Sequence, residues 1–305
     1  MEDAMKRIFC LMLVIAAVSL FGGYSSVGGD GDPPHTAAAQ IKFPAVVGES
    51  FFEHEPEHFV VANENFSNLQ LAEIDKPVYD KYEVLEREAK GLSLNLPEIE
   101  PYRAEKVAYL TFDDGPDDKV TPTILDILKA EGVHATFFVL GSMVEQNPNV
   151  LKRIFNEGHA IGNHSYNHVY SELYRSPWDF ADQFIKTDEI IKETIGVRPL
   201  IIRAPGGTAG VFNNDYWAMV DSCGYAEYDW NASTEDATAS VPNASRQVDN
   251  IIKQLKDYQP NTLIILMHSK AGKEETAKAL PVLIDLLRNK GYKFGVVTPM
   301  TPQPW

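Results

Sequence analysis

The feature that most constrains the fold of this chain is a regular alternation of segments that starts at Lys106. Apolar runs such as "VAYLTF" and "TLIILMHS" alternate with amphipathic runs, several of which end in glycine. Roughly seven strand–helix pairs follow one another over about 195 residues, which predicts a parallel sheet covered by helices. That length is slightly short for an eight-fold barrel, so we expect a distorted, imperfectly closed (β/α)7 barrel. An open doubly wound sheet is the alternative.

Ionisable and hydrogen-bonding residues recur where the expected strands end. In parallel α/β folds the carboxyl ends of the strands form the active face, because the strand-to-helix loops gather there. Five separate segments deliver such groups to one rim, and this recurrence predicts an active site. The segments are Asp113-Asp114, "NHSYNH" at 163–168, "RAPGG" at 203–207, "DWNASTED" at 229–236 and His268.

The adjacent carboxylates of Asp113 and Asp114 repel each other unless a cation lies between or beside them. His164 and His168 are four residues apart, a spacing that on a helical turn points both imidazoles the same way. Taken alone, the pair is also compatible with two partly exposed loop histidines. With one carboxylate it forms a two-histidine, one-carboxylate set with open positions, which is typical of a catalytic metal site.

Other polar residues are expected to be structural. His134 and His159 precede strands, where hydrogen-bonded structural histidines are the simpler interpretation. Asp117 and Asp118 are expected to be solvent-facing charges at a helix N-terminus, where they are favourable against the helix dipole.

Five motifs in this order resemble those of the polysaccharide deacetylases (carbohydrate esterase family four). The resemblance covers about residues 106 to 300, and its first two motifs are highly specific together. It implies a distorted (β/α)7 barrel and metal-dependent hydrolysis of N-acetyl groups on sugar polymers. The motifs read "TFDDGP", "HSYNH", "RAPGG", "DWNASTEDA" and "LMHS".

The resemblance also implies roles for individual residues. Asp114, His164 and His168 would bind the metal. Asp113 would be the general base that takes a proton from the attacking water, and Arg203 would pair with Asp113 and hold its orientation.

The remaining roles concern the leaving group and the walls of the site. His268 would be the general acid for the departing amine, with Asp236 hydrogen-bonded to it, and the backbone N–H of Gly206 would help to bind the oxyanion. Two positions depart from the family pattern. Gly206 stands where an aromatic residue is frequent, and Asp236 lacks the tryptophan that often follows it. Trp230 and Leu266 are expected to supply apolar wall instead.

The first 105 residues divide into three segments by composition. Two cations and roughly 14 apolar residues within 1–23 predict a signal peptide or membrane anchor. Residues 24–40 are rich in Gly, Ser, Pro and Ala, which predicts a flexible linker. Residues 41–105 form an acid-rich extension with an expected short helix at 78–90, either packed against the main domain or acting as a spacer. The catalytic domain is expected to span 106–305.

The net charge argues against one class of function, and the cysteines bear on disulfide bonding. A formal net charge of -16 argues against binding to nucleic acid. The chain has 2 cysteines, and a disulfide between Cys10 and Cys223 is not expected.

We therefore expect an exported or N-terminally anchored monomer of the cell envelope that is a metal-dependent N-deacetylase of a GlcNAc-containing polymer, above all peptidoglycan. Zinc is the expected metal, with cobalt, nickel or manganese as alternatives. Chitin oligomers, poly-N-acetylglucosamine and acetylated xylan are the alternative substrates. A non-catalytic wall-glycan-binding module is the alternative of another class.

Overall fold

The structure, a computed structural model, describes residues 58–103 and 106–304. The expected signal peptide or anchor at 1–23, the expected linker at 24–40 and the first part of the expected extension lie outside the described residues. Within the described part of the chain, no helix is both long and apolar enough to cross a membrane.

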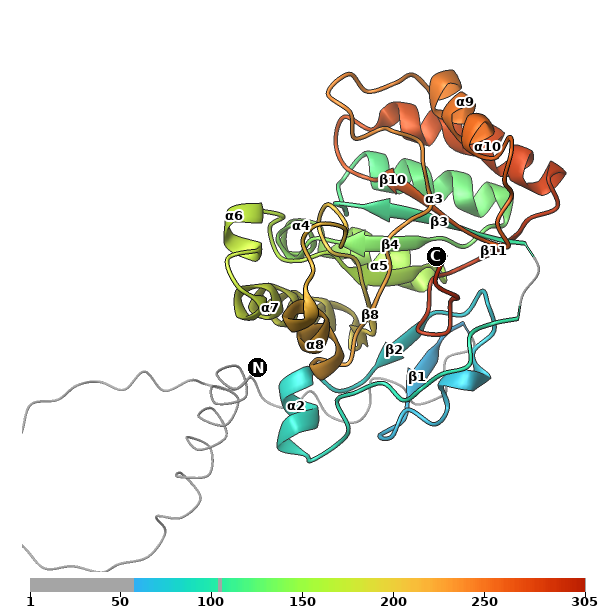
Figure 1. The fold of residues 1–305 in the computed structure, drawn as a ribbon. Coiled ribbons are helices and arrows are strands. Elements are labelled where there is room, and N and C mark those ends of the chain that lie inside the picture. Colours follow the sequence, from blue (N-terminus) through green and yellow to red (C-terminus); the bar gives the residue numbers. More distant parts are fainter. Residues whose placement is uncertain (1–57, 104–105, 305) are drawn as a thin grey trace, which may run out of the picture. The chain divides into compact units, whose positions relative to one another are not determined.

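The centre of the described unit is an eight-stranded sheet in which neighbouring strands pair in parallel (Figure 1). Seven strands follow the order β8-β7-β5-β4-β3-β10-β9, and β11 pairs with β3. This incompletely closed parallel sheet confirms the expected distorted (β/α)7 architecture, with the two-residue strand β9 as an addition. The strands are β3 (Val107–Asp113), β4 (Thr136–Val139), β5 (Ala160–Asn163), β7 (Ile201–Ile202), β8 (Ala226–Glu227), β9 (Ala232–Ser233), β10 (Thr262–His268) and β11 (Lys293–Gly295).

Helices connect these strands and cover the sheet (Figure 1). The long helix α7 begins where the Ser176 side chain accepts a hydrogen bond from the Asp179 amide, and it ends at Gly196 with φ 84°. A side-chain cap and a left-handed glycine are the usual start and stop signals of a helix, so local sequence sets the bounds of α7. The helices are α3 (Val120–Glu131), α4 (Gly141–Gln146), α5 (Pro148–Asn156), α6 (Tyr170–Leu173), α7 (Pro177–Ile195), α8 (Asn214–Ser222), α9 (Ala244–Gln254) and α10 (Glu274–Asn289).

Strand β3 is the central element of the sheet, and all seven of its residues are buried. It pairs with β10 along its full length, in a register that sets His268 opposite Asp113. On its other edge it pairs first with β11 and then with β4. The parallel register therefore brings the polar ends of two strands that are far apart in sequence to the same point of the rim.

Two strands from residues 58–103 and one strand from the main domain form a second, three-stranded sheet in the order β1-β2-β6. Its strands are β1 (Val60–Ala62), β2 (Val78–Asp80) and β6 (Arg198–Pro199), and the segment also contains a 3-10 turn at Leu69–Leu71 and helix α2 (Val84–Ala89). The expected helix at 78–90 is wrong in its first part, because Val78–Asp80 pairs with strands on both sides. The helix begins only after Glu83, which forms a capping box with Glu86.

A cluster of fully buried charges joins this segment to the main sheet. The Asp80 carboxylate accepts hydrogen bonds from the guanidinium groups of Arg87 and Arg198. Arg198 also donates to Asp188 of α7 at 3.2 Å, and the Tyr225 hydroxyl donates to the same carboxylate at 2.7 Å. Buried charges are tolerated only when each one keeps its partners, so the cluster depends on Asp80.

The isosteric substitution Asp80→Asn should destabilise the folded protein strongly. It removes the negative charge between two buried guanidinium groups, and breaking a buried ion pair on one side costs about 3–5 kcal/mol. Urea unfolding followed by circular dichroism measures the change. Glu100→Gln is the control, because its partner Arg103 is 3.9 Å away and both side chains are exposed. Equal unfolding midpoints for the two variants would contradict the importance of the cluster.

His159 lies buried immediately before β5. Its Nδ1 accepts a hydrogen bond from the Ala135 amide at 3.2 Å, and its ring packs edge-on against His134 and Phe137. Burial, together with the nearby His134 and Arg153, lowers the pKa of His159 to about 3. The imidazole is therefore neutral in the folded protein, in keeping with the structural role expected from the sequence.

The neutral His159 predicts a pH-dependent stability. Between pH 6.5 and about 3 the unfolded chain protonates this residue and the folded protein does not, so stability falls as the pH is lowered through that window. The contribution of one such group approaches about 1.4 kcal/mol per pH unit. In urea unfolding at pH 4, 5 and 6, His159→Gln should show a slope against pH that is flatter by about this amount. Identical slopes for variant and native protein would refute the assignment.

Candidate metal centre and active site

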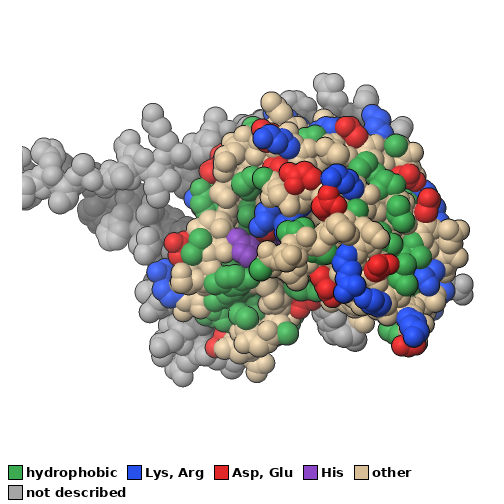
Figure 2. Space-filling view, turned by 90° about the horizontal axis from the view of Figure 1, so that it is seen from above, with side chains coloured by type: hydrophobic (Ala, Val, Ile, Leu, Met, Phe, Trp, Pro, Cys, Tyr) green, Lys and Arg blue, Asp and Glu red, His purple; other side chains and the backbone are tan. Residues whose placement is uncertain are grey.

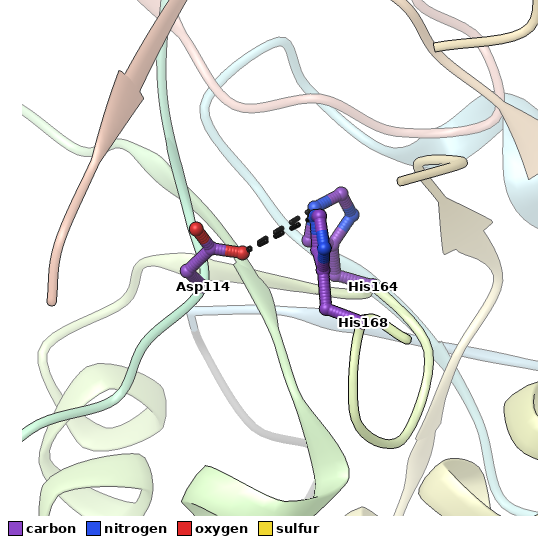
Figure 3. A group of neighbouring side chains, drawn as sticks. All are labelled: Asp114, His164 and His168. Carbon is purple, nitrogen blue, oxygen red and sulfur yellow. Dashed lines mark ion pairs between the residues drawn. The ribbon is translucent and has the colours of Figure 1, made fainter. Parts of the chain in front are cut away.

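Asp114, His164 and His168 form a group whose ligand atoms all lie within 4.8 Å of one another (Figure 3). Asp114 follows β3, and both histidines belong to the loop after β5. The Asp114 Oδ1 atom is 3.7 Å from His164 Nε2 and 3.6 Å from His168 Nε2. These distances are too long for hydrogen bonds. Two tetrahedral ligands at about 2.1 Å from one ion would be about 3.4 Å apart, so the spacing fits a shared divalent metal.

The hydrogen bonds of the three side chains also fit a metal. His164 Nδ1 donates to the Arg203 carbonyl oxygen at 2.8 Å, which leaves Nε2 as the lone-pair donor facing Asp114. Asp114 Oδ1 is buried and has no hydrogen-bond partner within residues 58–103 and 106–304. A carboxylate oxygen left in this way is costly without a cation. Asp114, His164 and His168 therefore have the chemistry of a metal site.

The backbone at these ligands is unusual, and the surrounding structure holds it in place. Asp114 and His168 have φ of 72° and 60°, in the left-handed region that non-glycine residues seldom adopt. The His168 amide donates to Ser165 Oγ, and the Ser165 amide donates to Asn163 Oδ1. The Asn163 side-chain amide, through Nδ2, in turn donates to Asp188 Oδ1 at 2.7 Å. The loop that carries both histidines is thus connected to the buried charge cluster around Asp188.

Asp113 is buried and paired with Arg203. Arg203 Nη1 donates to Asp113 Oδ1 at 2.9 Å and to Thr111 Oγ1 at 2.7 Å, while its Nε donates to the Tyr228 carbonyl oxygen. These bonds fix the guanidinium, which in turn fixes the carboxylate. The second carboxylate oxygen of Asp113 lies 3.7 Å from His164 Nε2, on the side of the candidate metal centre.

His268 and Asp236 form a second oriented pair. His268 Nδ1 lies 2.7 Å from Asp236 Oδ1, and the His268 amide donates to the other oxygen of the same carboxylate. Thr276 also donates to Asp236. Burial alone would lower the pKa of His268, but the hydrogen bond and the charge of Asp236 outweigh burial and raise it. His268 Nε2 lies 3.9 Å from Asp114 Oδ2, so the free ring nitrogen faces the metal group.

These groups line one pocket of about 300 Å³. Gly206, Trp230 and Leu266, the residues expected to contact substrate, line it as well. The structure therefore brings together every site residue expected from the sequence, with Arg203 and Asp236 behind the pocket as partners of lining residues. The full lining is Asp113, Asp114, His164, His168, Tyr170, Gly206, Trp230, Ala237, Leu266, His268, Lys270 and Lys273.

Four of these lining residues, Tyr170, Ala237, Lys270 and Lys273, were not expected. Lys270 Nζ lies 2.7 Å from Asp114 Oδ2, and Lys273 Nζ donates to the Asp236 carbonyl oxygen. Although burial raises the pKa of Asp114, the Coulomb interactions with His164 and Lys270 and the hydrogen bond from Lys270 lower it to about 2 overall. Tyr170 and Ala237 complete the four. Each of Lys270 and Tyr170 follows a motif histidine by two residues, which is the only sequence signal for them.

Tyr170 also accounts for the glycine in the third motif. Gly206 has φ 79°, and a Cβ atom built there would lie 2.7 Å from the Tyr170 hydroxyl. A side chain at position 206 would be strained by this φ and would require Tyr170 to move. At this position the aromatic wall of the pocket comes from α6 instead of from the third motif.

One expectation about the acidic turn is wrong. Asp117 is buried, not solvent-facing, because its Oδ1 accepts a hydrogen bond from the Thr121 amide in the first turn of α3 at 2.7 Å. The Thr121 hydroxyl donates to the Ser269 carbonyl oxygen, which ties this turn to the segment after β10. Asp118 is exposed, as expected.

Comparison with known proteins gives a consistent result. Residues 101–228 match the family described as polysaccharide deacetylase. A peptidoglycan-N-acetylglucosamine deacetylase of Bacillus cereus is 39% identical over 196 residues, which cover 64% of this chain and 67% of that protein. A protein of the same description from Listeria monocytogenes is 33% identical over 226 residues, or 74% of this chain, but the match spans only 44% of its length.

Solved structures agree with the sequence matches. The catalytic domain of a peptidoglycan N-acetylglucosamine deacetylase from Eubacterium rectale superposes with a TM-score of 0.60 at 31% identity, covering 67% of this chain and 94% of that domain. A carbohydrate esterase family four enzyme of Streptococcus mutans gives the same TM-score at 31% identity, covering 69% of this chain and 94% of the other. The fold and the site thus define a polysaccharide deacetylase domain. The chain belongs to the polysaccharide deacetylase family, carbohydrate esterase family four.

Proposed function

We propose that the chain is a metal-dependent hydrolase that removes N-acetyl groups from a GlcNAc-containing polysaccharide, and that peptidoglycan is its substrate. The observation that carries the proposal is that three groups with different chemistry lie at one pocket. They are a candidate metal group, a carboxylate fixed by a buried arginine and an imidazole fixed by a buried carboxylate. Metal-assisted amide hydrolysis uses all three kinds of group, whereas a glycan-binding module needs neither an acid nor a base.

The metal would be held by Asp114, His164 and His168, and we propose zinc, with cobalt, nickel or manganese as alternatives. A divalent ion bound there would polarise the acetyl carbonyl and lower the pKa of a water molecule. Two imidazoles and one carboxylate leave open positions, as catalytic sites do.

Asp113 would act as the general base. Arg203 occupies one of its carboxylate oxygens, so the other oxygen, on the side of His164, is the one available to accept the proton of the attacking water. His268 would act as the general acid. Asp236 accepts the hydrogen bond from Nδ1, which directs Nε2 into the pocket, where it can protonate the departing amine nitrogen. The Gly206 amide would donate to the developing oxyanion.

The similar proteins support the choice of substrate and of cellular location. Proteins described as peptidoglycan N-acetylglucosamine deacetylases recur among the similar sequences and structures. We propose that this chain likewise acts on the wall glycan, outside the cytoplasm, after export directed by the apolar segment within 1–23. Another similar structure is a domain of a multidomain xylanase, so acetylated xylan remains a substrate to compare.

The first test concerns the metal. Full-length protein treated with a chelator should lose acetate release from peptidoglycan and regain it with added zinc or cobalt. His164→Ala should lose the bound metal in elemental analysis, because it removes one of three ligands. His134→Ala is the matched control, since His134 is exposed and does not line the pocket. Chelator-insensitive acetate release would refute the metal assignment.

The second test separates the base from the ligands. Asp113→Asn should keep the metal but lower acetate release by about 10²–10⁴-fold, the usual contribution of a general base. Asp118→Asn, an exposed residue of the same turn, should behave as the native protein does. Near-native activity of Asp113→Asn would show that another group takes the proton.

The third test concerns the substrate. Acetate release from peptidoglycan, chitin oligomers, poly-N-acetylglucosamine and acetylxylan should be fastest, as kcat/KM, for peptidoglycan. A preference for acetylxylan would show that the chain cleaves O-acetyl esters in place of N-acetyl amides. Binding of glycan by the metal-loaded protein without acetate release from any of the four would support a non-catalytic binding module.

A further inference from the structure

Hydrophobic side chains are exposed on two segments that follow strand ends of the active face, the segments after β5 and after β7. Four of the ten large hydrophobic residues exposed in the described part of the chain are Val169, Tyr170, Val211 and Trp217. Figure 2 shows hydrophobic side chains gathered next to a surface histidine on the face that it displays. We call these four residues the rim surface. Isolated exposed hydrophobic residues are ordinary, but a group at the edge of a binding pocket is not.

The rim surface lies on the active face of the sheet. Val169 and Tyr170 belong to the segment after the carboxyl end of β5, and Tyr170 itself lines the pocket. Val211 and Trp217 belong to the segment after the carboxyl end of β7, with Trp217 in the first turn of α8. Both segments therefore start from the same strand ends that carry the catalytic groups.

A chain of aromatic rings links the pocket to Trp217. The ring centroids of Tyr170 and Tyr174 are 5.9 Å apart, and those of Tyr174 and Tyr216 are 6.1 Å apart. Tyr216 lies 5.2 Å from Phe212, which lies 5.1 Å from Trp217. The two ends of this chain are exposed, at 51% for Tyr170 and 40% for Trp217, whereas Tyr216 between them is buried. The inner rings pack against Tyr170 and Trp217, so the orientation of these two exposed side chains is restricted.

The pocket is too small to hold more than a short part of a polymer. Its volume of about 300 Å³ lies at the lower end of the range for small-molecule sites. The neighbouring residues of a polysaccharide must therefore cross the surface next to the pocket. Pyranose rings have apolar C–H faces, and such faces pack well on exposed aromatic rings.

We propose that the rim surface binds the sugar residues that flank the one in the pocket, so that the polymer leaves the pocket over α6 and the start of α8. This inference rests on the proposed function and deepens it, because it assigns the path of the polymer across the surface and a residue, Trp217, that distinguishes long substrates from short ones. Trp217 is the outermost ring of the aromatic chain, and it is not among the residues that line the pocket with the metal group, the acid and the base.

Trp217→Ala tests the proposal with GlcNAc oligomers of two and six sugars. For the metal-loaded full-length enzyme, kcat/KM for the six-sugar oligomer should fall about fivefold to tenfold, which is the effect of losing one aromatic contact. The fall should come from a higher KM, while kcat stays unchanged. The value for the two-sugar oligomer should change by less than about twofold, because that substrate does not reach Trp217. Trp217→Phe should retain most of the long-oligomer activity. Tyr258→Ala is the control, since Tyr258 is 70% exposed but precedes the amino end of β10.

Calorimetric binding of the six-sugar oligomer, measured in the metal-loaded Asp113→Asn background, separates this inference from the proposed function. Weaker binding in the Trp217→Ala double variant supports the rim surface even if no acetate is released by the native enzyme. If the Trp217→Ala change alters neither the binding of the six-sugar oligomer nor kcat/KM for either oligomer, the proposed role of the rim surface is wrong. The proposed deacetylase function is then unaffected. Thermal unfolding of Trp217→Ala establishes that the variant is folded. If it is not, Trp217→Gln, which keeps a long side chain but removes the aromatic ring, replaces it in the same measurements.

Discussion

The parallel pairing of β3 with β10 is the constraint on which the site depends. Its register sets Asp113 opposite His268, so the carboxylate of one strand and the imidazole of another lie at the same level of the rim. The neighbouring strands β5 and β7 end at that rim too, and they deliver His164 and Arg203. A shift of β10 by one residue would turn the His268 side chain to the other face of the sheet.

The site also solves an electrostatic problem. Asp113 and Asp114 are adjacent, buried carboxylates, an arrangement that is unfavourable without compensating charge. Arg203 neutralises the first, while the second faces two imidazoles and Lys270. The two aspartates thereby acquire different environments, and with them different chemistry. Separation of two like groups by their surroundings is how one site can hold both a ligand and a base.

Much of the barrel and of the candidate site could be predicted from the sequence. The bounds of α7 could be predicted from local signals, because Ser176 and Pro177 mark its start and Gly196 marks its end. The strand at Val78–Asp80 was missed, since its stability comes from pairing with β1 and β6 and not from its own pattern. The burial of Asp117 was missed for a similar reason, because its environment includes the segment after β10.

By itself, the sequence determined the alternation of strands and helices and the order of the five motifs, because periodicity and motif spacing are local properties. The tertiary structure alone decided which side chains touch. It brought Tyr170 over Gly206, Lys270 onto Asp114 and Asp80 against Arg198, in pairs separated by 36, 156 and 118 positions. Such contacts follow from the register of the sheet and the packing of the helices on it, which no single stretch of the chain encodes.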